Sequence, residues 1–121
     1  MSDSGLELQQ DGKSKGREEF ILIVTTVGKP DEAEKLAGML VKERKAACVS
    51  ISSPVKSVYR WQGNVEVEAE IMLFIKTVKA NYQKVEQLIR ENHSYDVPEI
   101  IALPIVQGEV KYLQWLREQC S

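Results

Sequence analysis

The feature that most constrains this fold is an alternating segment, residues 46–77, with a turn signal near its middle. The apolar residues on alternate positions before the turn are Ala47, Val49, Ile51, Val55, Tyr59 and Trp61. Gly63-Asn64 is a dipeptide suited to a tight hairpin turn. Each strand can reach about 12 residues, roughly twice the usual length, so we expect the hairpin to project beyond its domain. Pro54 lacks an N–H and predicts a bend or bulge.

The strand after the turn has two unlike faces. Its first face is apolar throughout, with Val65, Val67, Ala69, Ile71, Leu73 and Ile75. The second face is acidic at Glu66, Glu68 and Glu70 and turns apolar at Met72 and Phe74. A two-layer domain leaves such a face to water, so Met72 and Phe74 predict an interface between copies of the chain. The three carboxylates form either a hard-cation site or, more commonly, a solvated face.

Hydrophobic periodicity predicts the other elements. Residues 20–27, FILIVTTV, are typical of a strand covered on both faces. Pro30 suits the first position of a helix with an i, i+3, i+4, i+7 apolar stripe. Residues 82–92 predict a second amphipathic helix, and residues 100–106 a short strand. With a last helix after Gly108, the order is β-α-β-β-α-β plus a helix.

That order predicts an α+β, ferredoxin-like sandwich with a long hairpin and an additional C-terminal helix. We expect one domain over residues 20–121, because 121 residues bury one core and not two. Residues 1–19 are polar, with too little apolar surface to offset the entropy of ordering, and predict a mobile leader.

Composition excludes several classes of partner. Sixteen basic and eighteen acidic residues give a net charge of -2, so no global field favours nucleic acid. No apolar run approaches the ~20 residues that span a bilayer. Residues 1–19 lack the apolar core of an export signal, which predicts a cytoplasmic protein without membrane partners. The two cysteines are too few for a disulfide scaffold.

Few residues suggest chemistry. No nucleophile has an evident paired base, so we expect no enzyme and no catalytic residue. Cys48 suits a soft metal ion, although a packed small residue is the commoner role. His93 is the only histidine and lies near Tyr95, Asp96 and Glu99 in the sequence. It is either a binding group in this exposed segment or a histidine that stabilises the end of the preceding helix.

Five segments, taken together, resemble the CutA divalent-cation-tolerance family across residues 20–118. The segments are TTVGKPDEAEKLA, LVKERKAACVSI, SVYRWQGNVEVEAEIMLFIKT, NHSYDVPEIIALPI and YLQWL. The resemblance implies a homotrimer in which long hairpins meet around a threefold axis and leave clefts between subunits, as in PII signalling proteins. It also implies a role in tolerance of copper or another divalent cation, through metal binding.

The resemblance also implies site residues. Some members are thought to bind copper through a strand-one cysteine and two adjacent histidines; this chain has Thr25 at the first position and Asn92-His93-Ser94 at the second. His93 and Cys48 are therefore the predicted metal ligands. The predicted cleft residues are Tyr59, Trp61, Lys76, Thr77, Tyr95 and Glu99. An alternative function is a PII-like trimeric module that binds a small metabolite or a protein partner in these clefts.

Overall fold

The structure, a computed structural model, describes residues 19–121. Its elements are β2 (Phe20–Val27), α1 (Pro30–Lys42), β3 (Cys48–Ile51), β4 (Val55–Trp61), β5 (Asn64–Val78), the 3-10 turn η2 (Lys79–Asn81), α2 (Tyr82–Asn92), β6 (Ile100–Pro104) and α3 (Val110–Gln119). The predicted α+β order is confirmed. The predicted mobile leader, apart from Glu19, lies outside the described residues.

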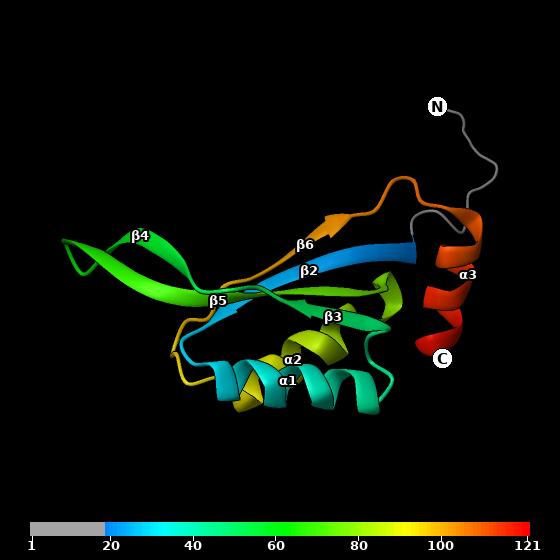
Figure 1. The fold of residues 1–121 in the computed structure, drawn as a ribbon, viewed down its shortest axis with the longest axis horizontal. Coiled ribbons are helices and arrows are strands. Elements are labelled where there is room, and N and C mark those ends of the chain that lie inside the picture. The colour runs from blue at the N-terminus through cyan, green and yellow to red at the C-terminus, as the bar shows by residue number, and fades with distance from the viewer. Residues whose placement is uncertain (1–18) are drawn as a thin grey trace.

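The strands form one antiparallel sheet in the order β3-β5-β2-β6, and β4 pairs with the far part of β5. Figure 1 shows α1 and α2 side by side beneath the sheet, α3 at one end, and the β4–β5 hairpin reaching out at the other. This is the ferredoxin-like arrangement that the element order predicts. The 15 residues of β5 belong to both the sheet and the projecting hairpin.

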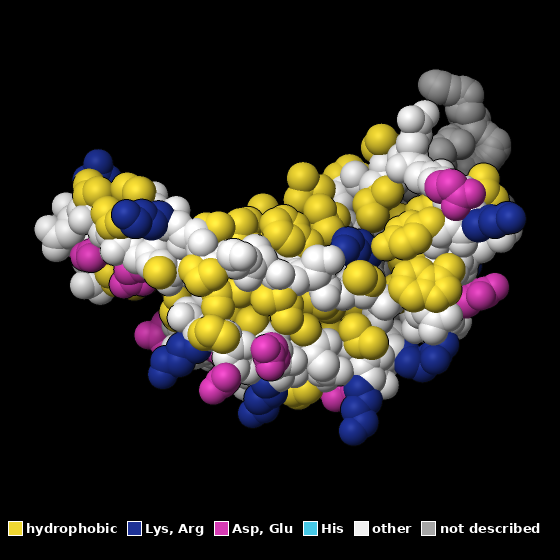
Figure 2. All heavy atoms as spheres, viewed as in Figure 1, with side chains coloured by type: hydrophobic (Ala, Val, Ile, Leu, Met, Phe, Trp, Pro, Cys, Tyr) yellow, Lys and Arg dark blue, Asp and Glu magenta, His cyan; other side chains and the backbone are white. Residues whose placement is uncertain are grey.

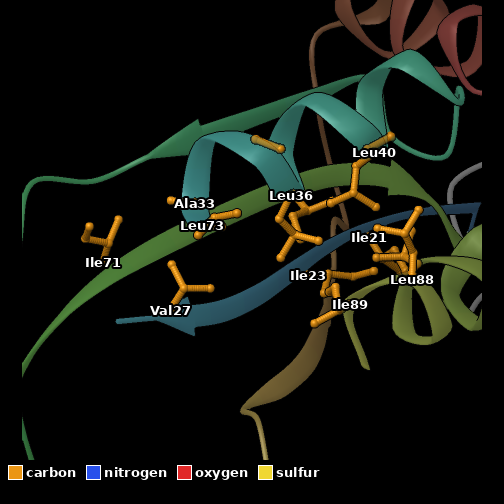
Figure 3. Close-up of a cluster of buried hydrophobic side chains, with 14 residues drawn as sticks. Ile21, Ile23, Val27, Ala33, Leu36, Leu40, Ile71, Leu73, Leu88 and Ile89 are labelled. Carbon is orange, nitrogen blue, oxygen red and sulfur yellow. The ribbon is translucent and has the colours of Figure 1, made fainter. Parts of the chain in front are cut away.

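The hydrophobic core lies between the sheet and the two helices beneath it. Ile23, Leu73 and Ile75 from the strands are fully buried, as are Leu36 and Ile89 from the helices. Figure 3 shows these layers meeting, with side chains from α1 and α2 directed at β2 and β5. No helix within residues 19–121 is long and apolar enough to cross a membrane.

The hairpin bends where the sequence predicts a bend, but turns one residue earlier than expected. Pro54 lies in the gap between β3 and β4, so one predicted strand becomes two. Trp61 pairs with Asn64, and the two turn residues are Gln62 and Gly63, with φ of 50° and 84°. Positive φ at both positions defines a type I′ turn, which favours glycine at the second position and leaves Asn64 to start β5.

The second face of the sheet carries apolar side chains, and within residues 19–121 only its end near Phe20 is covered, by Leu116 of α3. Met72 and Phe74 are half-buried there, as their sequence pattern predicts. On β6, Ile101 and Leu103 are 49% and 46% exposed. Figure 2 shows hydrophobic side chains gathered over the strands and beside α3, whereas charged side chains line the helix side. The protomer alone leaves this apolar face in water.

Candidate functional site

A pocket opens where the hairpin leaves the sheet. Its volume is about 750 Å³. Its lining consists of Thr26, Ser57, Val58, Tyr59, Trp61, Glu66, Glu68, Glu70, Tyr95, Asp96, Val97 and Glu99. Five of these residues are carboxylates, and none of the described lining residues is a lysine or an arginine. Concentrated charge of one sign in a concave surface attracts cations and repels anions.

The hairpin forms one wall of the pocket because its register places polar residues together. Glu66 lies opposite Tyr59, and Glu68 lies opposite Ser57. Alternate residues of a strand share a face, so Glu70 continues the same row. The pKa of the exposed Tyr59 phenol is raised, chiefly by its hydrogen bond to the Glu68 carboxylate. A raised phenol pKa is the expected effect of this negative row.

Glu70 is the carboxylate at the base of the row and is only 8% exposed. The Tyr95 hydroxyl donates to its Oε2 at 3.0 Å, and the Thr26 hydroxyl donates to the same oxygen at 3.4 Å. No hydrogen bond among residues 19–121 reaches its Oε1. A buried carboxylate needs such donors to offset its lost hydration. Glu70 thus joins the hairpin, β2 and the loop after α2.

Tyr95 forms the opposite wall of the pocket. Burial, followed by the hydrogen bond to Glu70, raises the pKa of its phenol to about 12. Its hydroxyl also lies against Gly28, where an added Cβ would approach to 3.3 Å. A larger residue at position 28 would therefore press on the hydroxyl that holds Glu70.

Removing the Tyr95 hydroxyl should change how stability depends on alkaline pH. The folded pKa, about 12, exceeds the ordinary value of 10.0, so the folded chain holds a proton that the unfolded chain releases. This contribution is complete below pH 10 and is lost as pH rises from 10 to about 12. Urea titrations across this range should show a shallower loss of stability for Tyr95→Phe than for the parent chain. Equal slopes would contradict the Tyr95–Glu70 bond.

His93 fixes the loop that carries Tyr95. Its imidazole is fully buried. Its Nδ1 accepts a hydrogen bond from the Tyr95 backbone N–H at 3.0 Å, so its proton resides on Nε2, which donates to the Thr26 carbonyl at 2.7 Å. Both ring nitrogens are therefore used within the chain. A metal ion would have to displace one of these bonds to obtain a lone pair.

Glu32 on α1 supports the same loop. Its Oε2 accepts from the Ser94 backbone N–H at 3.0 Å, and its carboxylate also accepts from the Ser94 hydroxyl. The loop after α2 is thus attached to α1 through Ser94 and to β2 through His93. These attachments place Tyr95 over Glu70.

Cys48, the other predicted metal ligand, lies on a different part of the sheet. It pairs with Lys76, whereas Thr26, the partner of His93, pairs with Met72. Met72 and Lys76 are four positions apart on β5, which corresponds to about 13 Å along the strand. The Lys76 ammonium lies 3.6 Å from the Cys48 sulfur and 2.6 Å from the Ser50 hydroxyl. His93 and Cys48 therefore do not share a site within one protomer.

Thr77 is fully buried. Its hydroxyl donates to the Lys45 carbonyl at 2.6 Å and lies 3.5 Å from the Cys120 sulfur. The structure thus places this predicted cleft residue between β5 and the chain's C-terminal end, away from the pocket. Its role in the protomer is to join these segments.

The structure brings together four of the six predicted cleft residues: Tyr59, Trp61, Tyr95 and Glu99. Lys76 and Thr77 lie elsewhere. Sequence reasoning missed Thr26 and Glu70 as partners and favoured a solvated face for the glutamate row. The sequence did contain a signal for one wall of the pocket. With the turn placed at Gln62-Gly63, hairpin pairing puts Glu66 beside Tyr59 and Glu68 beside Ser57. The contact from Tyr95 to Glu70 joins distant segments and left no local pattern.

The pocket residues fit a metal ion only in part. Carboxylates suit hard cations such as Mg²⁺, Ca²⁺ and Mn²⁺. Within the part of the chain that the structure describes, however, no three His, Cys, Asp or Glu side chains converge as a metal site requires. A divalent ion here would keep much of its water shell or take ligands from another copy of the chain.

Comparison with known proteins identifies relatives over most of the chain. Residues 21–119 match the model of the family described as CutA1 divalent ion tolerance protein. The divalent-cation tolerance protein CutA of Thermus thermophilus is 46% identical over 101 residues, which are 84% of this chain and 96% of that protein. The chloroplastic protein CutA 1 of Oryza sativa is 43% identical over 97 residues, 80% of this chain and 55% of that protein.

Solved structures of relatives share the fold. The crystal structure of CutA1 from Oryza sativa superposes with a TM-score of 0.84 at 39% identity, over 88% of this chain and 98% of that one. The structure of the divalent cation tolerance protein from Thermus thermophilus superposes with a TM-score of 0.82 at 41% identity, over 84% of this chain and 99% of that one. The chain spans about half the length of the plant and human relatives that it matches.

Proposed function

Since the chain belongs to the CutA1 divalent ion tolerance family, we propose that it binds divalent cations as a homotrimer, at the pocket beneath the hairpin. The single observation that carries the proposal is the pocket lining, with five carboxylates and no described basic residue. Relatives are named for divalent-cation tolerance, which agrees with a site that selects positive charge. The expected role is metal tolerance through binding, without a catalysed reaction.

Oxygen donors determine which ions the pocket would favour. Glu66 and Glu68 offer carboxylates that take part in no ion pair within residues 19–121. With Asp96 and Glu99 in the same lining, they would attract a Mg²⁺ or Mn²⁺ ion that keeps much of its water shell and exchanges readily. Weak, reversible binding suits a protein that responds to changes in ion concentration.

The open face of the sheet supports the homotrimer. Phe74, Ile101 and Leu103 form part of an exposed apolar surface, a feature that commonly marks a protein–protein contact. In addition, β4 and β6 each have one strand edge without a partner in the described sheet. An edge of one copy paired with a different edge of the next makes a head-to-tail contact, and three such contacts form a closed trimer when each is a rotation of 120°.

Calorimetric titration with Mg²⁺ and Mn²⁺ tests the cation site. We expect the double variant Glu66→Gln, Glu68→Gln to weaken binding about tenfold, because two of the five pocket carboxylates lose their charge while their shape is kept. Glu34→Gln, on the exposed side of α1, is the matched control and should bind as the parent chain does.

Equal affinities for the parent chain and the double variant would remove the pocket from the proposal. If His93→Ala or Cys48→Ser instead abolished binding of Cu²⁺, the copper site expected from the resemblance would be the functional one. We do not expect loss of Cu²⁺ binding in these variants. Both ring nitrogens of His93 are hydrogen-bonded, and Cys48 lies on a different part of the sheet from His93.

The second function, a PII-like module for a small metabolite, is favoured by one observation. A volume of about 750 Å³ greatly exceeds the space of one ion and lies in the range of small-molecule sites. The carboxylates oppose an anionic ligand, so a nucleotide such as ATP should not bind the pocket. Isothermal titration with ATP checks this expectation.

A further inference from the structure

The carboxylates of the pocket are spread along it. On β5, Glu66, Glu68 and Glu70 share one face at intervals of about 6.6 Å, set by the rise of a strand. No three acidic, histidine or cysteine side chains within residues 19–121 meet at a metal-sized point. A single ion can approach only part of such an array. A longer ligand with several separated positive charges satisfies it better.

Aromatic side chains provide the other half of the recognition surface. Tyr59 and Trp61, from β4, are 37% and 47% exposed and line the pocket together with Tyr95. An ammonium group gains energy over the face of an aromatic ring, most strongly over tryptophan. Alkyl segments also gain by covering exposed ring surface. A hydrated metal ion makes no comparable use of these rings.

The base of the pocket offers one specific anchor. Glu70 is nine-tenths buried, and both hydroxyl donors reach its Oε2. The only fully buried side-chain oxygen or nitrogen without a partner, within the described residues, is Thr25 Oγ1. Glu70 lines the pocket, and its Oε1 receives no hydrogen bond from residues 19–121. It is positioned to accept a hydrogen bond from a terminal ammonium group.

We propose that the pocket binds a linear aliphatic polyamine, with a terminal ammonium at Glu70, further ammonium groups along Glu68 and Glu66, and the alkyl chain against Trp61. The proposal shares one premise with the proposed function, that the pocket selects cations. It differs in the ligand, which is an extended organic cation. Polyamines carry ammonium groups separated by short alkyl spacers, which matches carboxylates spaced along a strand.

Calorimetric titration of the full-length chain with spermidine, in parallel with Mg²⁺ at matched ionic strength, tests this inference. We expect Trp61→Leu to weaken spermidine binding about fivefold, because the alkyl chain loses most of the ring surface that it covers, and to leave Mg²⁺ binding unchanged. Glu70→Gln should weaken spermidine binding about tenfold, since one charge-assisted hydrogen bond is lost. Trp115→Leu on α3, outside the pocket, is the aromatic control.

The outcomes separate this inference from the proposed function. Tight spermidine binding that depends on Trp61 and Glu70 supports it, whether or not Mg²⁺ binds. Mg²⁺ binding without spermidine binding overturns it and leaves the proposed function intact. Spermidine binding that is equal in the parent chain and in Trp61→Leu also overturns it, because charge alone would then explain the affinity. Circular dichroism confirms that each variant is folded before titration.

Discussion

Replacing Phe74 with glutamate should convert the proposed homotrimer into monomers. Phe74 is half-buried at the centre of the open apolar face, opposite Val24 of β2 and Ser50 of β3. In an assembly that covers this face, each new carboxylate would be buried without a partner. That costs several kcal/mol per copy, so association should weaken by at least about a thousandfold. Sedimentation equilibrium measures the change directly.

Two variants control for the substitution itself. Phe74→Leu keeps the face apolar and should remain trimeric. Gln83→Glu adds the same charge on the exposed side of α2, where the proposed assembly makes no contact, and should also remain trimeric. A monomeric parent chain, or a trimer that tolerates Phe74→Glu, would show that the open face is not the assembly surface.

Removing the His93 imidazole should destabilise the fold by about 3 kcal/mol. In His93→Ala, the Thr26 carbonyl and the Tyr95 N–H lose their partners. Each unsatisfied buried group costs about 1–3 kcal/mol, and the empty space left by the ring adds to the loss. Urea denaturation at one fixed protein concentration measures the effect, because dissociation of an oligomer makes stability depend on concentration.

Comparison variants separate the two roles of His93. His93→Gln retains a donor and an acceptor and should recover part of the lost stability. Lys84→Ala, exposed on α2, should change stability by less than about 0.5 kcal/mol. If His93→Ala were as stable as the parent chain but lost metal affinity, His93 would be a ligand and the hydrogen-bonded role described above would be wrong.

The fold was predictable because its signals are local. The eight-residue run of β2 and the helical stripe after Pro30 each specify one element, and Pro54 marks the break between β3 and β4. The predicted turn, Gly63-Asn64, was wrong by one residue, because the two turn residues are Gln62 and Gly63. The observed pairing of Trp61 with Asn64 sets the register of the acidic row.

The site was predictable only where one segment carries it. Tyr59 and Trp61 lie on the hairpin, and hairpin pairing places them on the pocket face beside the glutamate row. The surroundings of Thr77 and Glu70 depend on contacts across 25 or more residues of sequence, and no periodic pattern records such contacts. His93 illustrates the same limit. Its residue type suggests a metal ligand, whereas the positions of Thr26 and Tyr95 engage both of its nitrogens.

We propose that this chain binds divalent cations in the carboxylate pocket beneath the hairpin. Crystals soaked in Mn²⁺ test it most directly, because anomalous scattering locates the ion without prior assumptions about its ligands. We predict a peak in the pocket beside Glu66 and Glu68. A peak at His93 or Cys48, or the absence of any peak in the pocket, would contradict the claim.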